Sequence, residues 1–533
     1  MKSKIFLVLC IFFQFNSTSQ INYATLDHNN VAVHISDAGT YFVNLVNSTK
    51  GYEIPKGSGH HTIYTAQFWF AGKDTNNILH RSRGAYPGYG RDIYNGPVSN
   101  NYGSPAYQAA WSNSMWSICQ LDIDQFKNWW ACNSGMQTTG CDTVSSPSME
   151  VMESIYSWPA HGDVSIGQSY FLAPFFDFNS DGNYNPDDGD YPIIKGCCEN
   201  YMIQNDMAES HTYSDTDSIG IELHLMFYQY QTSDYLNDVT FIDVMAINRG
   251  NTDYPIFSQG ILLDADIGYY GDDFFGCDTL TNTMYFYNSD NFDENNFGQT
   301  GYDLNPPAIG IVGLKNKFTT SAPFIIGTTG SMNENEWNVM NGLKNNGTPW
   351  LNPDSVETKF VFNGNPMDQS TWSEVSMNNL SGDRRGSSST SIHSFHAGDT
   401  ILQTYAILYA RNGNNLENAS SIIDLAADVK VFYDTQSHVQ CSNGILNLTE
   451  NDNSLFTIAP NPSSGQFMIT SEEQNISSVK VFDAQGKMVK ELKPTNPKIM
   501  NIDLSDQHKG FYILYINNEK VKSTFHKILI QNR

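Results

Sequence analysis

The chain has 533 residues and a formal net charge of −27, from 29 Lys and Arg residues against 56 Asp and Glu residues. A hydrophobic fraction of 40% and an aromatic fraction of 13% exclude a disordered or collagen-like chain, and the length suffices for about three domains. The negative charge argues against nucleic acid and anionic lipid as partners, because binding these polyanions needs clustered Lys and Arg, and it favours calcium as the charged partner.

Residues 1–19 are typical of a secretory signal peptide. Lys2 and Lys4 form a positive start, an apolar run covers 5–13, and small residues at 17–19 suit a cleavage site. This run is shorter than the roughly 20 residues that a membrane-spanning helix needs, and no other stretch is long enough. The sequence therefore predicts an exported mature chain without a transmembrane segment.

The body that follows is expected to be mainly β and to consist of two packed units, 20–200 and 201–440, because one core rarely serves so long a segment. Alternating apolar and polar residues over 221–228 and 239–245 predict strands with one buried face. Apolar residues at helical spacing predict one helix near 416–434, packed against the sheet.

A loop rich in Asp and Asn begins at Asp177 and places oxygen-bearing side chains at alternate positions, as in a calcium-binding loop. Gly182 stands where an EF-hand loop turns sharply. No helix precedes this loop, and Asp188 replaces the usual bidentate Glu, so Asp190 is a second candidate for the closing ligand. The alternative is an Asx-rich surface turn without metal. The predicted ligands of a structural calcium ion are Asp177, Asn179, Asp181, Asn183, Asp188 and Asp190.

A second acidic cluster follows the apolar run 261–263. It fits a second cation site or carboxylate network, a solvated loop, or the acid and base of a glycosidase, whose carboxyl groups stand about 5–10 Å apart. Sequence alone does not measure that separation. The residues of this cluster are Asp264, Asp266, Asp272 and Asp273.

Cysteine use is compatible with an oxidising compartment and disulfide bonds. Of the eight cysteines, Cys10 falls in the signal segment, and the remaining odd number leaves at least one thiol free or paired between chains. Cysteines within 119–141 are close enough for a loop-closing bridge. The neighbours Cys197 and Cys198 are expected to bond to other parts of the chain.

Motifs of several common enzyme classes are absent from the sequence: it contains no HExxH, GxSxG, Walker or GxGxxG pattern. The pair His60-His61 lacks the further Cys or His residues that complete a zinc site. Among the aromatic residues, Trp129 and Trp130 lie in a polar stretch and are the best candidates for an exposed binding surface.

A linker, 441–453, leads to a tail, 454–533, whose charge is more basic than that of the body. Short β-prone runs separated by turn formers predict a small antiparallel sandwich in the tail. Its motifs resemble the type A C-terminal sorting domain of the type IX secretion system. These motifs are APNP at 459–462, VKVFD at 479–483, GFYIL at 510–514 and KIL at 527–529.

This resemblance implies an immunoglobulin-like fold for the tail and passage across the outer membrane of a Gram-negative bacterium by the secretion machinery. The exported protein is then released or attached to surface lipopolysaccharide. Segments of the body also resemble a group of uncharacterised exported proteins that share this tail, which implies neither a fold nor a mechanism. They are 26–31, 55–59, 177–192, 264–278 and 398–400.

The sequence therefore predicts a secreted or cell-surface protein, stabilised by calcium, that acts as an adhesin-like binding or structural component of unknown ligand. Extracellular glycans are candidate partners. The alternative is an extracellular hydrolase that acts on polysaccharide through its carboxylates.

Overall fold

The computed structural model separates the chain into two units, a body that ends at residue 444 and a tail that comprises 445–533. The structure describes residues 21–85, 90–324, 332–435, 439, 441, 456–460, 463–471, 475–482, 488–505, 507, 509–518 and 524–530. The predicted signal peptide and most of the predicted linker lie outside these residues.

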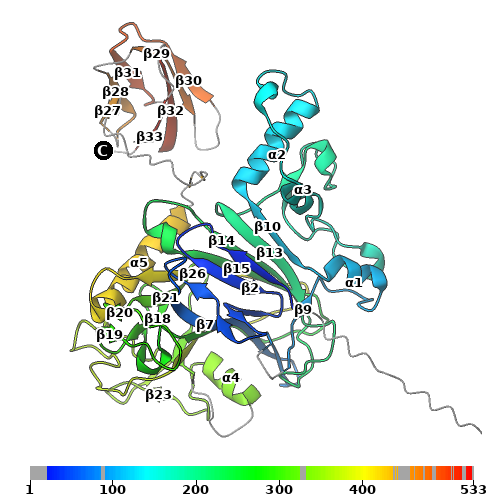
Figure 1. Cartoon of the computed structure of the whole chain (residues 1–533), viewed down its shortest axis with the longest axis vertical. Helices are drawn as coiled ribbons and strands as arrows, with labels where there is room; N and C mark the ends of the chain where they lie inside the picture. Colours follow the sequence, from blue (N-terminus) through cyan, green and yellow to red (C-terminus); the bar gives the residue numbers. More distant parts are fainter. Residues whose placement is uncertain are drawn as a thin grey trace, which may run out of the picture. The chain divides into compact units, whose positions relative to one another are not determined.

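Two nine-stranded antiparallel sheets form the body, which confirms the prediction of a mainly β fold (Figure 1). The first sheet runs, in spatial order, β1 (Tyr23–Leu26), β2 (Ala32–Ser36), β6 (Tyr52–Glu53), β7 (His61–Lys73), β16 (Ile256–Ala265), β25 (Arg384–Ile392) and β22 (Thr320–Pro323), with β3 (Thr40–Tyr41) and β8 (Leu79–Arg83) also paired to β7. The second sheet runs β10 (Met115–Cys119), β13 (Cys198–Asn205), β14 (Ile221–Gln229), β15 (Thr240–Asn248), β26 (Thr400–Ala410), β21 (Ala308–Gly313), β18 (Thr283–Asn288) and β17 (Asp273–Asp278), with β9 (Tyr94–Asn95) also paired to β13.

Strand alternation directs one face of each sheet into a common core. In β26, Tyr405 and Ile407 enter the core between the sheets, whereas Ala406 and Leu408 face the opposite side. Strand β14 contains the strand predicted at 221–228, and β15 covers the strand predicted at 239–245 except its first residue, Val239. Both strands are buried on both faces rather than on one.

The body differs from the predicted division into units 20–200 and 201–440. That boundary falls inside β13, which pairs with β10 on one side and β14 on the other. Residues from both sheets also belong to one hydrophobic cluster. Antiparallel pairing between strands that are distant in sequence therefore joins the whole body into one unit.

Helices cover the outer faces of the sheets. The long helix α5 contacts β18, β21 and β26 (Figure 1), and it contains the helix predicted near 416–434. Gly310 lets α5 approach closely, because a Cβ atom there would lie 2.5 Å from Ile422. None of the described helices is long and apolar enough to cross a membrane. The helices are α1 (Pro105–Trp111), α2 (Gln120–Asn133), α3 (Met149–Tyr156), α4 (Met332–Met340) and α5 (Asn415–Thr435).

Short elements complete the body. Its two-stranded ribbons are β4 (Val43–Asn44) with β5 (Thr49–Lys50), β11 (Phe175–Phe176) with β12 (Tyr191–Pro192), β19 (Phe292–Asp293) with β20 (Asp303–Leu304), and β23 (Trp350–Leu351) with β24 (Glu357–Thr358). Single 3₁₀ turns cover Cys141–Thr143, Val164–Ile166, Pro186–Asp188, Tyr235–Asp238 and Tyr270–Asp272.

The tail has two small sheets around its own hydrophobic cluster. All the short strands that the sequence predicts there are present. An immunoglobulin-like topology for the tail stays a prediction. The first sheet contains β27 (Thr457–Ala459), β28 (Gln466–Thr470) and β31 (Ile499–Asp503), and the second contains β30 (Met488–Leu492), β29 (Ile476–Phe482), β32 (Gly510–Asn518) and β33 (Thr524–Ile530).

Three disulfide bonds cross-link the described part of the body. The bridge Cys132–Cys141 closes a short loop, as the spacing suggested. Cys198, the first residue of β13, and Cys197, which precedes it, bond to distant partners, in Cys119–Cys198 and Cys197–Cys441. The last of these joins residues 244 apart in sequence, and closing so long a loop restricts the unfolded chain strongly.

Cys277 is the free cysteine among the described residues, and it is buried in β17, where its thiol donates to the carbonyl of Val361 at 3.2 Å. Burial raises the pKa of this thiol, and only the thiolate reacts rapidly with disulfide reagents. We expect the oxidised chain without its signal segment to show no reactive thiol in its native state and one after denaturation, measured by thiol titration. A thiol that reacts rapidly before unfolding would contradict this placement.

Candidate functional site

The predicted calcium loop lies between β11 and β12. In its first half, side-chain oxygens accept hydrogen bonds from backbone N–H groups. The Asp177 carboxylate accepts the N–H groups of Asp181 (3.2 Å) and Gly182 (2.8 Å). Asn179 accepts the same Asp181 N–H at 3.0 Å. Asp181 accepts the N–H of Asn183 at 2.7 Å, which lowers the pKa of Asp181. The side chains at alternate positions thus turn toward one short stretch of backbone, an arrangement that Asx-rich turns and calcium-binding loops share.

Asp190 and Asp188 play different parts in the second half of the loop. Asp190 is fully buried, and its two oxygens accept the N–H groups of Phe178 and Asn185, both at 2.8 Å. Asp188 is exposed and accepts the side-chain amide of Asn185 at 2.7 Å. Asp190 therefore joins the two halves of the loop, while Asp188 lies at its surface.

Trp130, which the sequence suggested as an exposed binding residue, packs on this loop instead. Its indole N–H donates to the carbonyl of Asp187 at 2.8 Å, and its ring lies 4.9 Å from that of Phe178. A Cβ atom at Gly189 would lie 2.7 Å from the same indole ring. Helix α2 therefore supports the loop directly.

The second predicted cluster is divided in the structure, and Asp264 and Asp266 form one part. Asp264 in β16 lies opposite Arg385 in β25, with 2.8 Å between Oδ2 and Nε, and Arg385 also contacts Asp383 at 3.0 Å. Lys50 lies 3.3 Å from Asp266. Burial raises the pKa of both Asp264 and Asp266, and the neighbouring cations oppose this shift. The sequence did not indicate Lys50, Asp383 or Arg385, because only strand pairing brings them here.

Asp272 and Asp273 form the other part. Asp273 is fully buried and accepts the N–H of Ile267 at 3.2 Å. Burial, reinforced by the nearby Glu294 carboxyl group and opposed by the neighbouring Asn288 side chain, raises the pKa of Asp272 to about 8. These carboxyl groups are thus shielded from water rather than placed in a solvated loop.

Groups of at least three His, Cys, Asp or Glu ligand atoms within 4.8 Å of one another occur at two places in the described part of the chain. One is formed by Asp264 with Asp266 and Asp383. The other contains His28, but its two sulfur atoms belong to the disulfide Cys119–Cys198 and are not available to a metal. The predicted calcium loop is neither of these groups, so no three of its four candidate Asp carboxylates have oxygens within 4.8 Å of one another.

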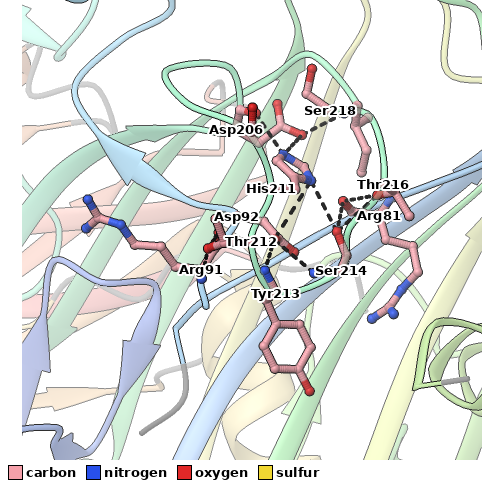
Figure 2. A network of polar contacts seen from close by, with 12 residues as sticks. Arg81, Arg91, Asp92, Asp206, His211, Thr212, Tyr213, Ser214, Thr216 and Ser218 are labelled. Atoms are coloured by element: carbon pink, nitrogen blue, oxygen red, sulfur yellow. Dashed lines mark hydrogen bonds and ion pairs between the residues drawn. The ribbon is translucent and has the colours of Figure 1, made fainter. Parts of the chain in front are cut away.

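Figure 2 shows a further polar network, centred on His211, that the sequence did not indicate. The Nε2 atom of His211 donates to the carbonyl of Asp206 at 2.8 Å, and Nδ1 faces the Ser214 hydroxyl at 3.3 Å. The Asp206 carboxylate accepts the N–H groups of residues 219–221 at 2.7–3.0 Å. Asp206, His211 and Ser214 are the residue types of a catalytic triad. All three are buried here, whereas a catalytic serine must be accessible to its substrate. The network therefore holds this segment against β8, where Ser214 contacts the carbonyl of Arg81.

Comparison with known proteins identifies the tail. Residues 457–531 match the family model of the secretion system C-terminal sorting domain, which confirms the predicted type IX sorting tail. The protein is therefore exported and either secreted or attached to the cell surface, and its tail engages the secretion machinery.

Comparison does not identify the body. No curated protein matches the sequence. Among solved structures, a polysaccharide lyase has 7% identity and a TM-score of 0.18, over 60% of this chain and 35% of that one. A copper-containing benzylamine oxidase from Hansenula polymorpha has 8% identity and a TM-score of 0.27, over 79% and 65%. The chain thus spans less than two thirds of either protein, and similarity this low supports no assignment of function.

Proposed function

We propose that the exported protein acts outside the cell as a calcium-stabilised, adhesin-like binding or structural component. The observation that carries this proposal is the loop 177–190, in which side-chain oxygens at alternate positions converge on one turn of backbone. Its candidate partners are extracellular glycans and, for an anchored form, surface lipopolysaccharide. A protein that works outside the cell meets abundant calcium, which suits a structural site of moderate affinity.

In this proposal, Asp177, Asn179 and Asp181 supply side-chain oxygens and Asn183 supplies its carbonyl. Asp188, which is exposed, closes the cage, and Asp190 keeps the two halves of the loop together. The bound cation would offset the repulsion among these carboxylates and tie the loop to helix α2 through Trp130.

We expect calcium titrated into the full chain to release binding heat and to raise the thermal midpoint. A ligand at 100 times its Kd adds about 2.7 kcal/mol to the free energy of unfolding. Asp181→Ala should weaken binding at least about tenfold, because it removes a charged ligand and the acceptor of one loop hydrogen bond. Isothermal titration calorimetry measures the calcium affinity of the native chain and of Asp181→Ala.

Asp187→Ala is the matched control, since it removes one carboxylate from the same loop but none of the proposed ligands. Its side chain accepts the hydroxyl of Tyr156 and is exposed. Calcium binding should persist in this variant. Equal calcium binding by Asp181→Ala and the native chain, or no heat on addition of calcium, would contradict the calcium site and indicate an Asx-rich turn without metal.

A second candidate function is an extracellular hydrolase acting on polysaccharide. The raised pKa of Asp272, to about 8, favours it, because a general acid must hold its proton at neutral pH. Against it, Asp264 and Asp266 are engaged by cationic side chains. Incubation with a polysaccharide panel, with assay of new reducing ends, separates the two functions: product that disappears in Asp272→Asn indicates a hydrolase, and retention without product indicates a binding protein.

A further inference from the structure

A cavity of about 640 Å³ opens on the outer face of the second sheet, beside the C-terminal end of α5. Its floor is formed by Tyr228 of β14 and Phe241 of β15, which are directly paired across the sheet. Their rings stack with centroids 5.2 Å apart and an angle of 13° between planes. The floor is therefore a stacked pair of largely buried rings that backbone pairing holds in place, with the ring faces turned toward each other.

Two further aromatic rings form a wall. Tyr230 follows β14 and meets Phe432 of α5 edge to face, with centroids 5.2 Å apart and an angle of 83°. Both side chains are only half-buried, so part of each ring faces the cavity. Exposed aromatic faces of this kind pack against the C–H face of a sugar ring and bury it at low cost in conformational entropy.

Three lysines stand around this aromatic cavity. Lys195 pairs with Asp243, and Lys430 lies 2.9 Å from Asp434 on the next turn of α5. Lys315 is exposed and has no ion-pair partner within the described residues. The Lys195 and Lys315 side chains are exposed at the mouth of the cavity, whereas the Lys430 ammonium group already donates to the Leu314 carbonyl and to both Asp434 oxygens.

The charge of this cavity is opposite to that of the chain. Its lining holds three lysines and the Asp434 carboxylate, and Asp243 pairs with Lys195, so these five charges sum to +1, whereas the chain carries a net charge of −27. Glu199, which lies opposite Tyr228 in the sheet, adds no negative charge at neutral pH, because burial raises its pKa to about 8. The cavity is thus a local positive site on an acidic protein, which favours an anionic ligand.

We propose that this cavity binds an anionic saccharide, a sugar ring that carries a carboxylate or a sulfate group. The rings of Tyr230 and Phe432 contact the sugar, and the lysines at the rim pair with its anionic group. This inference rests on the proposed binding function and names the class of ligand. Lysine suits either anion, because its ammonium group is a point charge without the planar fork of arginine.

Titration calorimetry of the full chain with oligogalacturonate and with a sulfated galactan oligosaccharide tests the proposal. The neutral controls are methyl-esterified oligogalacturonate and the desulfated galactan, which keep the rings and lose the charge. At least one anionic probe should bind, its neutral form should bind at least about tenfold more weakly, and affinity should fall with added salt. The two arms distinguish a carboxylate from a sulfate ligand.

Variants locate the binding in this cavity. Lys315→Gln combined with Lys430→Gln should weaken binding about tenfold or more, and Phe432→Leu should also weaken it, because leucine retains the apolar contact but lacks the ring. Lys317→Gln is the matched control, since this exposed lysine lies two residues beyond Lys315 and outside the cavity lining. Its affinity should match that of the native chain, and far-ultraviolet circular dichroism should show all variants folded.

Each other outcome has a defined meaning. Equal binding of charged and neutral probes, or equal weakening by Lys317→Gln, overturns the anionic site but leaves the proposed binding function standing. Retention of none of the four saccharides overturns the anionic site, and if the wider polysaccharide panel also gives no retention, the proposed binding function fails with it. Release of new reducing ends from a bound probe favours the hydrolase.

Discussion

Glu336→Ala is expected to lower the free energy of unfolding of the body by about 3–5 kcal/mol, because it leaves two buried guanidinium groups without their shared carboxylate. Glu336 of α4 is fully buried and pairs with both Arg81 and Arg83 of β8. Burial, reinforced by the charge of Arg83, lowers the pKa of Arg81 to about 9. The Arg83 guanidinium also lies 3.9 Å from the ring centroid of Tyr213, beside the His211 network.

Urea unfolding followed by fluorescence measures this loss, and Glu334→Ala is the matched control. Glu334 lies one half-turn earlier in the same helix but is exposed. Its substitution should change the free energy of unfolding by less than about 1 kcal/mol, since exposed charges contribute little. Similar losses in the two variants would indicate that the helix as a whole, rather than the buried carboxylate, determines the stability of this region.

Features encoded in short stretches of sequence were predictable. The strands β14 and β15, the helix α5 and the strands of the tail follow from local periodicity, and each is present. The loop at Asp177 was also visible, because its hydrogen bonds join residues only two to five positions apart. A pattern within one segment needs no knowledge of how distant segments pair.

Features that depend on the pairing of distant strands were not predictable. Arg385 lies opposite Asp264 only because β25 pairs with β16. Lys50 of the two-stranded ribbon β4–β5 contacts Asp266, which follows β16. The cavity lined by Tyr230, Phe432 and the three lysines also depends on such pairing, because it combines residues from β14, β15 and α5. The division of the body into two units was wrong because it assumed that a long segment splits, whereas interleaved strands share one core.

Glu199 should make the stability of the body depend on pH. An unfolded glutamate titrates near its usual value of about 4.3, whereas burial raises the pKa of the folded residue to about 8. Between these values the folded state holds a proton that the unfolded state has lost, so the free energy of unfolding falls as pH rises. The expected decrease is about 1.4 kcal/mol for each pH unit within this interval, and it levels off above pH 8.

Glu199→Gln isolates this contribution, because glutamine retains an oxygen for the N–H of Lys195, which Glu199 accepts at 2.7 Å, and cannot ionise. Other buried carboxyl groups, such as Asp272, keep part of the slope in the variant. The difference between the native and variant slopes, measured by urea unfolding from pH 5.5 to 8.5, should therefore correspond to about one proton. Asp243, which carries a like charge nearby, raises the cost of ionising Glu199 further, while Lys195 offsets part of it. Parallel slopes would mean that Glu199 ionises freely, and a charged Glu199 would then reduce the positive potential of the neighbouring basic cavity at neutral pH.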